Sequence, residues 1–183
     1  MEALSKEQQK VIDNAKKMQS AWKGIKIEEL PKQGTEAYKA LAASLKEAGI
    51  ELDDFIAKSQ KEKINIKYDA IDKNIEDQIV AQQAIMNKAN ELALEAQADG
   101  NKEKYDDFIA QAQNAAATIA SLNNDRYNNE EERIKSLQTY YETVYDRMSK
   151  LSQTTREEIQ KNREAIASLL SEDILKGGAL NST

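Results

Sequence analysis

The chain contains no cysteine and no histidine among its 183 residues. Without cysteine it can form neither a disulfide framework nor a thiol nucleophile. The lack of both residue types excludes the usual zinc sites, and the lack of histidine excludes Ser-His-Asp triads and the Glu-x-x-His pairs of di-iron bundles. Neither GxGxxG nor GxxxxGK[ST], the common phosphate-binding loops, occurs. The sequence therefore predicts a protein that is not an enzyme, with no cofactor, metal site or small-molecule substrate.

Proline, glycine and large aromatic residues are scarce. There are one Pro, six Gly, two Phe and one Trp, whereas 32% of the residues are charged. The abundant residues, such as Ala, Gln, Glu and Lys, cost little free energy in a helix. A low aromatic content suits thin bundles, because each helix of such a bundle buries only an apolar stripe. These features favour an all-α fold, and the regular apolar spacing described below argues against disorder.

Long apolar runs and basic stretches are also missing. No run of about 18 apolar residues is present, so we expect no membrane-spanning helix. The first residues, MEALSKEQQKVID, lack the apolar core of a secretory signal peptide. The net charge is −6 and the basic residues are dispersed, which disfavours nucleic-acid binding. We expect a chain that is cytoplasmic or incorporated in a particle and whose partners are proteins.

Two helices are expected near the N-terminus. The first spans residues 5–23, because Ser5-Lys-Glu-Gln8 matches a capping box and an apolar stripe follows at steps of three and four residues. The second spans residues 36–48, with Thr35 as the N-cap and Gly49 directly after the helix. Both would bury one face against other helices.

Residues 53–176 predict a long antiparallel helical hairpin, a coiled-coil-like arm. No Gly or Pro occurs over 53–98, Asp99-Gly-Asn101 is a turn signal, and helical spacing resumes over 102–176. Residue i of the outgoing helix should then lie near residue 199 − i of the returning one. The clearest heptad pattern comprises Ile134, Leu137, Tyr141, Val144, Met148 and Leu151.

The apolar stripe resumes out of step at Ile159, beyond the reach of the outgoing helix. The same register leaves residues 147–176 without a partner in the hairpin, so we expect the N-terminal segment, residues 1–52, to cover them. The predicted fold is thus a hairpin with its turn near residues 99–101 and a small three- to four-helix base formed with the N-terminal helices. A flexible tail is expected over residues 177–183.

An Asn-rich stretch, residues 123–129, interrupts the apolar seam of the returning helix. Asn and Asp compete for backbone hydrogen bonds, so the helix could bend there and act as a hinge or docking point. Alternatively, the helix is continuous and the stretch supplies a polar layer that fixes the register of the two arms. We favour the polar layer.

Two stretches begin with the same residues, Asp53-Asp-Phe-Ile-Ala57 and Asp106-Asp-Phe-Ile-Ala110. A duplicated domain or a shared carboxylate site would explain the likeness, but the stretches stop matching after Gln60 and Gln113 and lie at opposite ends of the predicted hairpin. Acidic residues are favourable in the first turn of a helix. We therefore interpret both as helix starts. A loop that starts at Asp99 has Lys104 and Ala110 at the sixth and twelfth positions, where an EF-hand needs Gly and Glu, which indicates a polar turn.

Tyrosines cluster near the end of the heptad pattern. Tyr is enriched at protein interfaces, so Tyr140, Tyr141 and Tyr145 are candidate protein-interface residues. Trp22 is a fourth candidate. The alternative for each is packing within the chain, and for Trp22 its place in the stripe of the first helix favours that alternative.

Long helical hairpins with arms rich in Gln, Asn and Ala resemble, in general architecture, bacteriophage virion, tail and ejection proteins and rod-like components of bacterial secretion machines. The resemblance implies a structural or assembly protein, an elongated helical rod that self-associates or docks subunits in a larger complex. It transfers no role to any single residue. A second hypothesis is a soluble monomeric adaptor or inhibitor that binds one target protein through the Tyr140–Tyr145 region.

Overall fold

The computed structural model describes residues 2–150 and 153–175, where all regular structure is helical and no strand occurs. The chain forms two compact units, Met1–Tyr140 and Tyr141–Thr183. The predicted all-α fold is confirmed. The predicted tail at 177–183 lies outside the described residues, as does Leu151 of the heptad pattern.

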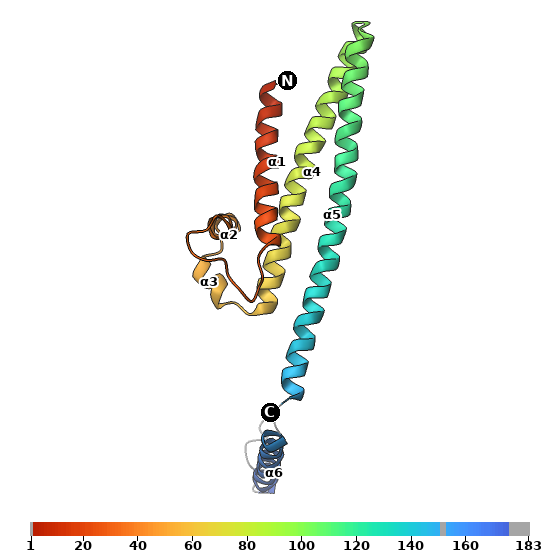
Figure 1. Cartoon of the computed structure of the whole chain (residues 1–183). Helices are drawn as coiled ribbons and strands as arrows, with labels where there is room; N and C mark the ends of the chain where they lie inside the picture. The colour runs from red at the N-terminus through yellow and green to blue at the C-terminus, as the bar shows by residue number, and fades with distance from the viewer. Residues whose placement is uncertain (1, 151–152, 176–183) are drawn as a thin grey trace. The chain divides into compact units, whose positions relative to one another are not determined.

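The arm is an antiparallel pair of long helices, α4 (Gln60–Ala98) and α5 (Lys102–Ser149), which pack extensively against each other (Figure 1). Near the turn their contact is made by small side chains. The buried alanines there are Ala89, Ala93 and Ala96 of α4 and Ala112 and Ala115 of α5. Farther from the turn the seam widens to hold Ile and Leu side chains. The predicted helical hairpin is confirmed.

The turn between the two helices lies at residues 99–101, as predicted. Gly100 adopts a φ of 69°, a left-handed conformation that glycine reaches without the strain of a side chain. The Asn101 N–H donates to the Ala96 carbonyl at 2.9 Å, which closes the end of α4. The Asn101 side chain accepts from the Lys104 N–H at 3.1 Å and so caps the start of α5. One short segment thus ends one helix and begins the next.

The outgoing helix begins at Gln60, so the prediction of an unbroken helix from residue 53 was wrong. A separate short helix, α3 (Leu52–Ala57), precedes it, and the backbone at Lys58 and Ser59 is extended. Ser59 caps α4, because its hydroxyl accepts from the Glu62 N–H at 3.4 Å. Ser59-Gln-Lys-Glu62 has the spacing of a capping box, a signal that the lack of Gly and Pro concealed.

The returning helix ends at Ser149, and α6 (Gln153–Leu175) is a separate helix. The prediction of helix throughout 102–176 was therefore wrong about continuity. Residues 123–129, in contrast, are helical without interruption inside α5. The break thus falls beside the polar stretch that follows residue 151, where the apolar stripe changes step.

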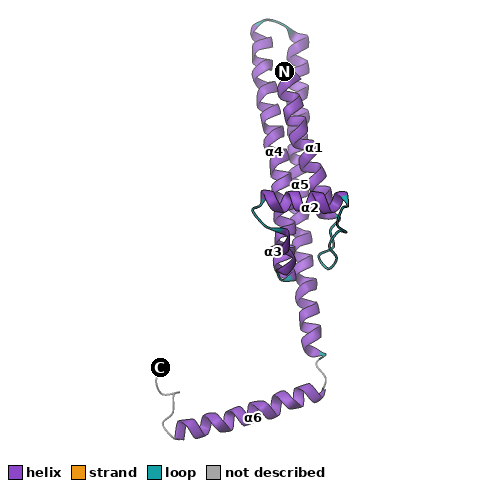
Figure 2. Cartoon of the chain, turned by 90° about the vertical axis from the view of Figure 1, so that its left-hand side faces the viewer, coloured by secondary structure: helices purple, strands orange, loops and turns teal. Residues whose placement is uncertain are grey.

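The base is formed by the N-terminal helices. Helix α1 (Glu2–Lys23) packs along α4, and α2 (Glu36–Glu47) packs on both α1 and α3. Figure 2 shows α2 lying across the long helices of the first unit. The predicted base is confirmed. The long contact of α1 is with α4, and the expectation that residues 1–52 cover residues 147–176 stays a prediction.

The core of the base contains the most deeply buried side chains of the described chain. Trp22 and Phe55 meet edge to face, with ring centroids 6.2 Å apart and planes at 78°. The fully buried large side chains are Trp22, Leu41, Leu45, Phe55, Ile71 and Ile75. Because these come from α1, α2, α3 and α4, the short helices are held to the arm mainly by apolar burial.

Local sequence signals predicted both ends of α2 correctly but not the start of α1. Thr35 accepts from the Tyr38 N–H at 3.2 Å and Gly49 has a φ of 72°, so both predicted ends of α2 are confirmed. Helix α1, however, begins at Glu2, which places Ser5 inside the helix. The predicted start at Ser5 was wrong, because the residue pattern of a capping box can also occur inside a helix that began three residues earlier.

Candidate protein-interaction site

The Asn-rich stretch places a polar layer between α4 and α5. The Asn129 side chain is 4% exposed, and its Nδ2 donates to the Tyr68 carbonyl at 3.0 Å. The Tyr68 hydroxyl shares a hydrogen bond of 2.8 Å with the Ser136 hydroxyl. A polar layer within a continuous helix is therefore observed, whereas the bend considered for residues 123–129 is not.

Two ion pairs flank this layer on the surface of the arm. The Arg126 guanidinium donates to both carboxylate oxygens of Asp72, at 2.8 and 3.1 Å, and Arg133 pairs with Asp69. The hydrogen bonds from Arg126 to Asp72, aided by the charge of that carboxylate, raise the pKa of Arg126. Since 199 − 72 is 127, the observed partner of Asp72 lies one residue from its predicted position. These bonds orient the two helices without forming a reactive site.

Lys67 ties the first connector to the arm. Its Nζ donates to the Ile25 carbonyl at 2.9 Å and lies 5.4 Å from the centre of the Tyr68 ring. Burial lowers the pKa of Lys67 below its ordinary value, and the charges of Glu132 and Glu28 partly oppose this. The residue holds α4 to the segment that follows α1.

This burial predicts a pH dependence of stability. The lowered pKa means that the unfolded chain holds the Lys67 proton up to a higher pH than the folded chain does. The contribution of Lys67 to the free energy of unfolding should therefore be constant and smallest at pH values below the folded pKa of Lys67. It should rise as the pH increases from that value toward 10.5, the unperturbed pKa. The Lys67→Met variant should lose this rise. Urea titrations from neutral pH to pH 10.5 would measure it.

A matched control is Lys73→Met, since Lys73 lies on the same helix and is exposed. Its free energy of unfolding should follow the wild-type pH dependence. Equal pH dependence of the wild type and the Lys67→Met variant would contradict the assigned burial of this ammonium group.

The surface depressions of the first unit offer little for a small ligand. One, of about 390 Å³, lies over the polar layer, and its lining residues are Asp72, Asn123, Arg126, Tyr127, Glu130 and Arg133. Its two cations are already paired with Asp72 and Asp69. Another, of about 490 Å³, is lined by Gly49, Ile50, Asp54, Ala57, Lys58, Ser59 and Glu62. In the second depression the Ser59 hydroxyl serves as the cap of α4.

The two acidic pairs do not form a common site. Asp53 and Asp54 lie in the first turn of α3, whereas Asp106 and Asp107 lie beyond the first turn of α5. The interpretation as helix starts is thus accurate for the first pair and one turn off for the second. Within the part of the chain that the structure describes, no three acidic side chains are arranged to hold a metal ion.

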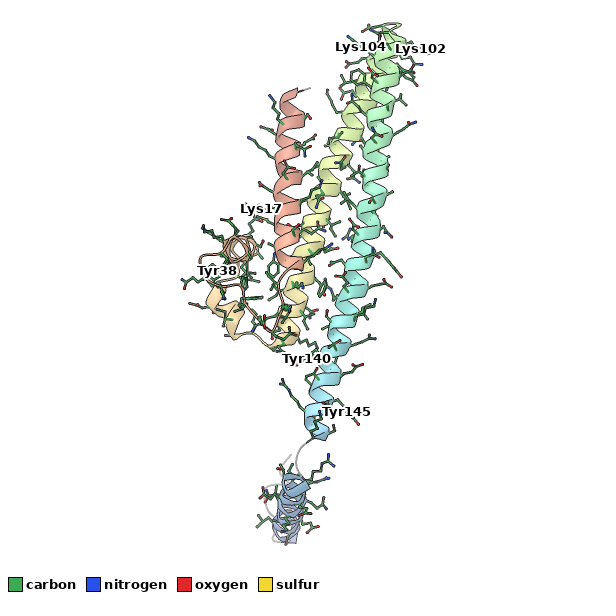
Figure 3. All side chains as sticks on the ribbon, viewed as in Figure 1. Lys17, Tyr38, Lys102, Lys104, Tyr140 and Tyr145 are labelled. Carbon is green, nitrogen blue, oxygen red and sulfur yellow. The ribbon has the colours of Figure 1, made fainter. Side chains whose placement is uncertain are left out.

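The four predicted interface residues differ in exposure. Trp22 is 1% exposed, so contact with a partner surface would require the base to open, and this candidate belongs to the core. Tyr140 is half-buried against the core of the first unit. Tyr141 and Tyr145, in the second unit, are 51% and 75% exposed. Figure 3 shows Tyr140 and Tyr145 along the lower part of α5. An interface role of the tyrosines stays a prediction.

The second unit has an apolar stripe, of which only Tyr141 and Tyr145 were predicted as interface residues. Its large exposed apolar side chains are Tyr141, Tyr145 and Met148 of α5 and Ile159, Ile166 and Leu169 of α6. Every side chain from Arg156 to Leu169 is exposed. The seven-residue spacing from Ile159 to Ile166 is the sequence signal for the part of this stripe on α6.

None of the helices over residues 2–150 and 153–175 has the length and apolar character needed to cross a membrane. Comparisons of the chain with protein-family models, curated proteins and solved structures find no match. The functional argument therefore depends on the surfaces described above.

Proposed function

We propose that the protein is a structural or assembly protein that joins copies of itself or other subunits in a larger complex. The observation that supports this is the apolar stripe of the second unit. Ile159, Ile166 and Leu169 are 46%, 54% and 65% exposed, although helices usually depend on burial of such a stripe for their stability. A phage virion or tail, or a secretion machine, is the kind of complex in which a helical hairpin of this type would serve.

The first unit fits the role of a rigid support. Its arm is fixed in register by the Asn129–Tyr68 bond and two ion pairs, and its base is fixed by the Trp22–Phe55 contact. None of these groups is arranged for proton transfer or nucleophilic attack. Non-enzymatic function is therefore part of the proposal.

Sedimentation equilibrium of the full chain tests self-association directly. The proposal expects a mass above that of the 20.6 kDa monomer at concentrations of about 1–100 μM, the range in which a modest helical interface is populated. A monomer over this whole range, together with no co-purifying subunit, would argue strongly against an assembly role.

The second candidate function is a monomeric adaptor or inhibitor that binds one target protein through the Tyr140–Tyr145 region. The exposure of Tyr145, 75%, favours it. Tyr145→Ala is a cleaner probe than Tyr140→Ala, because Tyr140 also packs on the core. The adaptor hypothesis expects a one-to-one complex with a captured target that is weakened by Tyr145→Ala and unaffected by Glu142→Ala. Equal affinities of these two variants would eliminate this site.

A further inference from the structure

The part of helix α6 from Ile159 to Leu169 has the side-chain pattern of a short two-stranded coiled coil, with Thr155 and Asp173 at the flanking d and a positions. With Ile159 and Ile166 at the a positions of a heptad, Asn162 and Leu169 fall at d. A β-branched residue at a combined with Leu at d favours parallel dimers over larger assemblies. The apolar members of this seam are exposed. The helix thus presents a seam that an identical helix would bury.

The polar residues of α6 specify how a second copy would lie. In a parallel dimer, a g residue of one helix faces the e residue five positions later on its partner. Glu158 and Arg163 occupy these g and e positions, so each would meet the opposite charge on the other chain. Asn162 would face its own counterpart, and the two amides can donate to and accept from each other. An antiparallel dimer centred on this segment would instead bring the Arg163 side chains toward each other.

We propose that α6 forms a parallel, in-register, two-stranded coiled coil with α6 of a second copy of this chain. The inference rests on the proposed assembly function and names its partner, orientation and register. Asn162 acts as the register-setting residue, because a pairing shifted by half a heptad would place its amide against Ile159 or Ile166, and one shifted by a whole heptad would place it against Thr155 or Leu169.

The charge of α6 favours a second copy over a charged partner or a lipid surface. Over its length, Gln153–Leu175, the helix carries three cationic residues, Arg156, Lys161 and Arg163, and five anionic ones, Glu157, Glu158, Glu164, Glu172 and Asp173. Helices that bind anionic membranes usually have polar faces rich in Lys and Arg. Helix α6 has no such excess of cations, and Glu158 of one copy can complement Arg163 of another.

Engineered cysteines test the orientation, because the natural chain has none to compete. Asn162→Cys in the full chain should form a disulfide-linked dimer under mild oxidation, since a parallel in-register seam places the two thiols together. Lys161→Cys is the matched control. It lies one residue away on the outward face, so it should remain largely monomeric on a non-reducing gel.

A second pair of variants tests the energetic role of the seam. Ile166→Asp places two carboxylates in the dimer seam, and we expect the dimer dissociation constant to increase by about 100-fold or more. Ser168→Glu adds the same charge to the outward face and should leave the dissociation constant within a few fold of the wild type. Sedimentation equilibrium measures both. Unchanged fluorescence of Trp22, the single tryptophan, would show that the first unit retains its fold.

The outcomes separate this inference from the proposed function. Selective cross-linking of Asn162→Cys together with the loss of association in Ile166→Asp supports the parallel coiled coil. An oligomer that neither variant affects overturns the coiled coil but leaves self-association standing. A wild-type chain that is monomeric at about 100 μM overturns the coiled coil, and with no partner subunit it overturns the assembly function as well. Vesicle binding by such a monomer would assign the stripe to a membrane surface.

Discussion

Replacing Phe55 by alanine is expected to lower the free energy of unfolding by about 3–5 kcal/mol. The Phe55 side chain is fully buried and packs edge to face on Trp22, so truncation would leave a cavity between α3 and α1. The aromatic contact adds about 0.5–1.5 kcal/mol to the loss beyond the area it buries. Urea titration followed by tryptophan fluorescence measures the effect, because Trp22 is the only tryptophan and lies at the altered contact.

The neighbouring residue supplies the control. Ile56 is 45% exposed, and Ile56→Ala should change the free energy of unfolding by no more than about 0.5 kcal/mol. Similar losses for the two variants would mean that the base is not organised around Phe55. Such a result would contradict the arrangement of α3 against the arm.

The second large effect is expected for Asn129→Asp. The substitution preserves the shape of the side chain but turns the donor that faces the Tyr68 carbonyl into a carboxylate oxygen. A buried charge without compensation costs about 3–5 kcal/mol, and we expect a loss of this size at pH 7. Thermal or urea unfolding of the full chain would measure it.

The pH dependence of this loss identifies its cause. Burial raises the pKa of the introduced carboxyl, so the folded chain binds its proton more readily than the unfolded chain does. Stability should therefore be regained as the pH falls, since the protonated acid can again donate to Tyr68. Asn128→Asp adds the same charge at an exposed neighbouring position and should show neither effect. A loss for Asn129→Asp that is independent of pH would rule out the buried-charge explanation.

Features that depend on a few neighbouring residues were predictable from the sequence. One to four residues suffice to predict the glycine turns after α2 and α4 and the Thr35 cap. All three features lie where predicted. The position of the single turn predicts which residues of α4 and α5 face each other. It places Asp72 opposite residue 127, one residue from its observed partner Arg126. Local rules therefore determined the arm and its turn.

The remaining features depend on contacts between distant segments. Whether Ser59 or Ser5 caps a helix is decided by where neighbouring helices need the chain to turn, and both residues carry a capping-box pattern. The docking of α1 along α4 could not be inferred, since the stripe of α1 would fit any apolar groove.

The counted register of the arm has a consequence for how this chain can change in length. Each helical residue adds a rotation of 100°, so one residue inserted or deleted between Gly100 and Arg126 would turn Asn129 away from Tyr68 and Arg126 away from Asp72 together. Seven residues added to both helices would restore every facing pair. The two sides of the hairpin are therefore expected to lengthen or shorten jointly and in whole heptads, while the segment beyond Ser149 is free of that constraint.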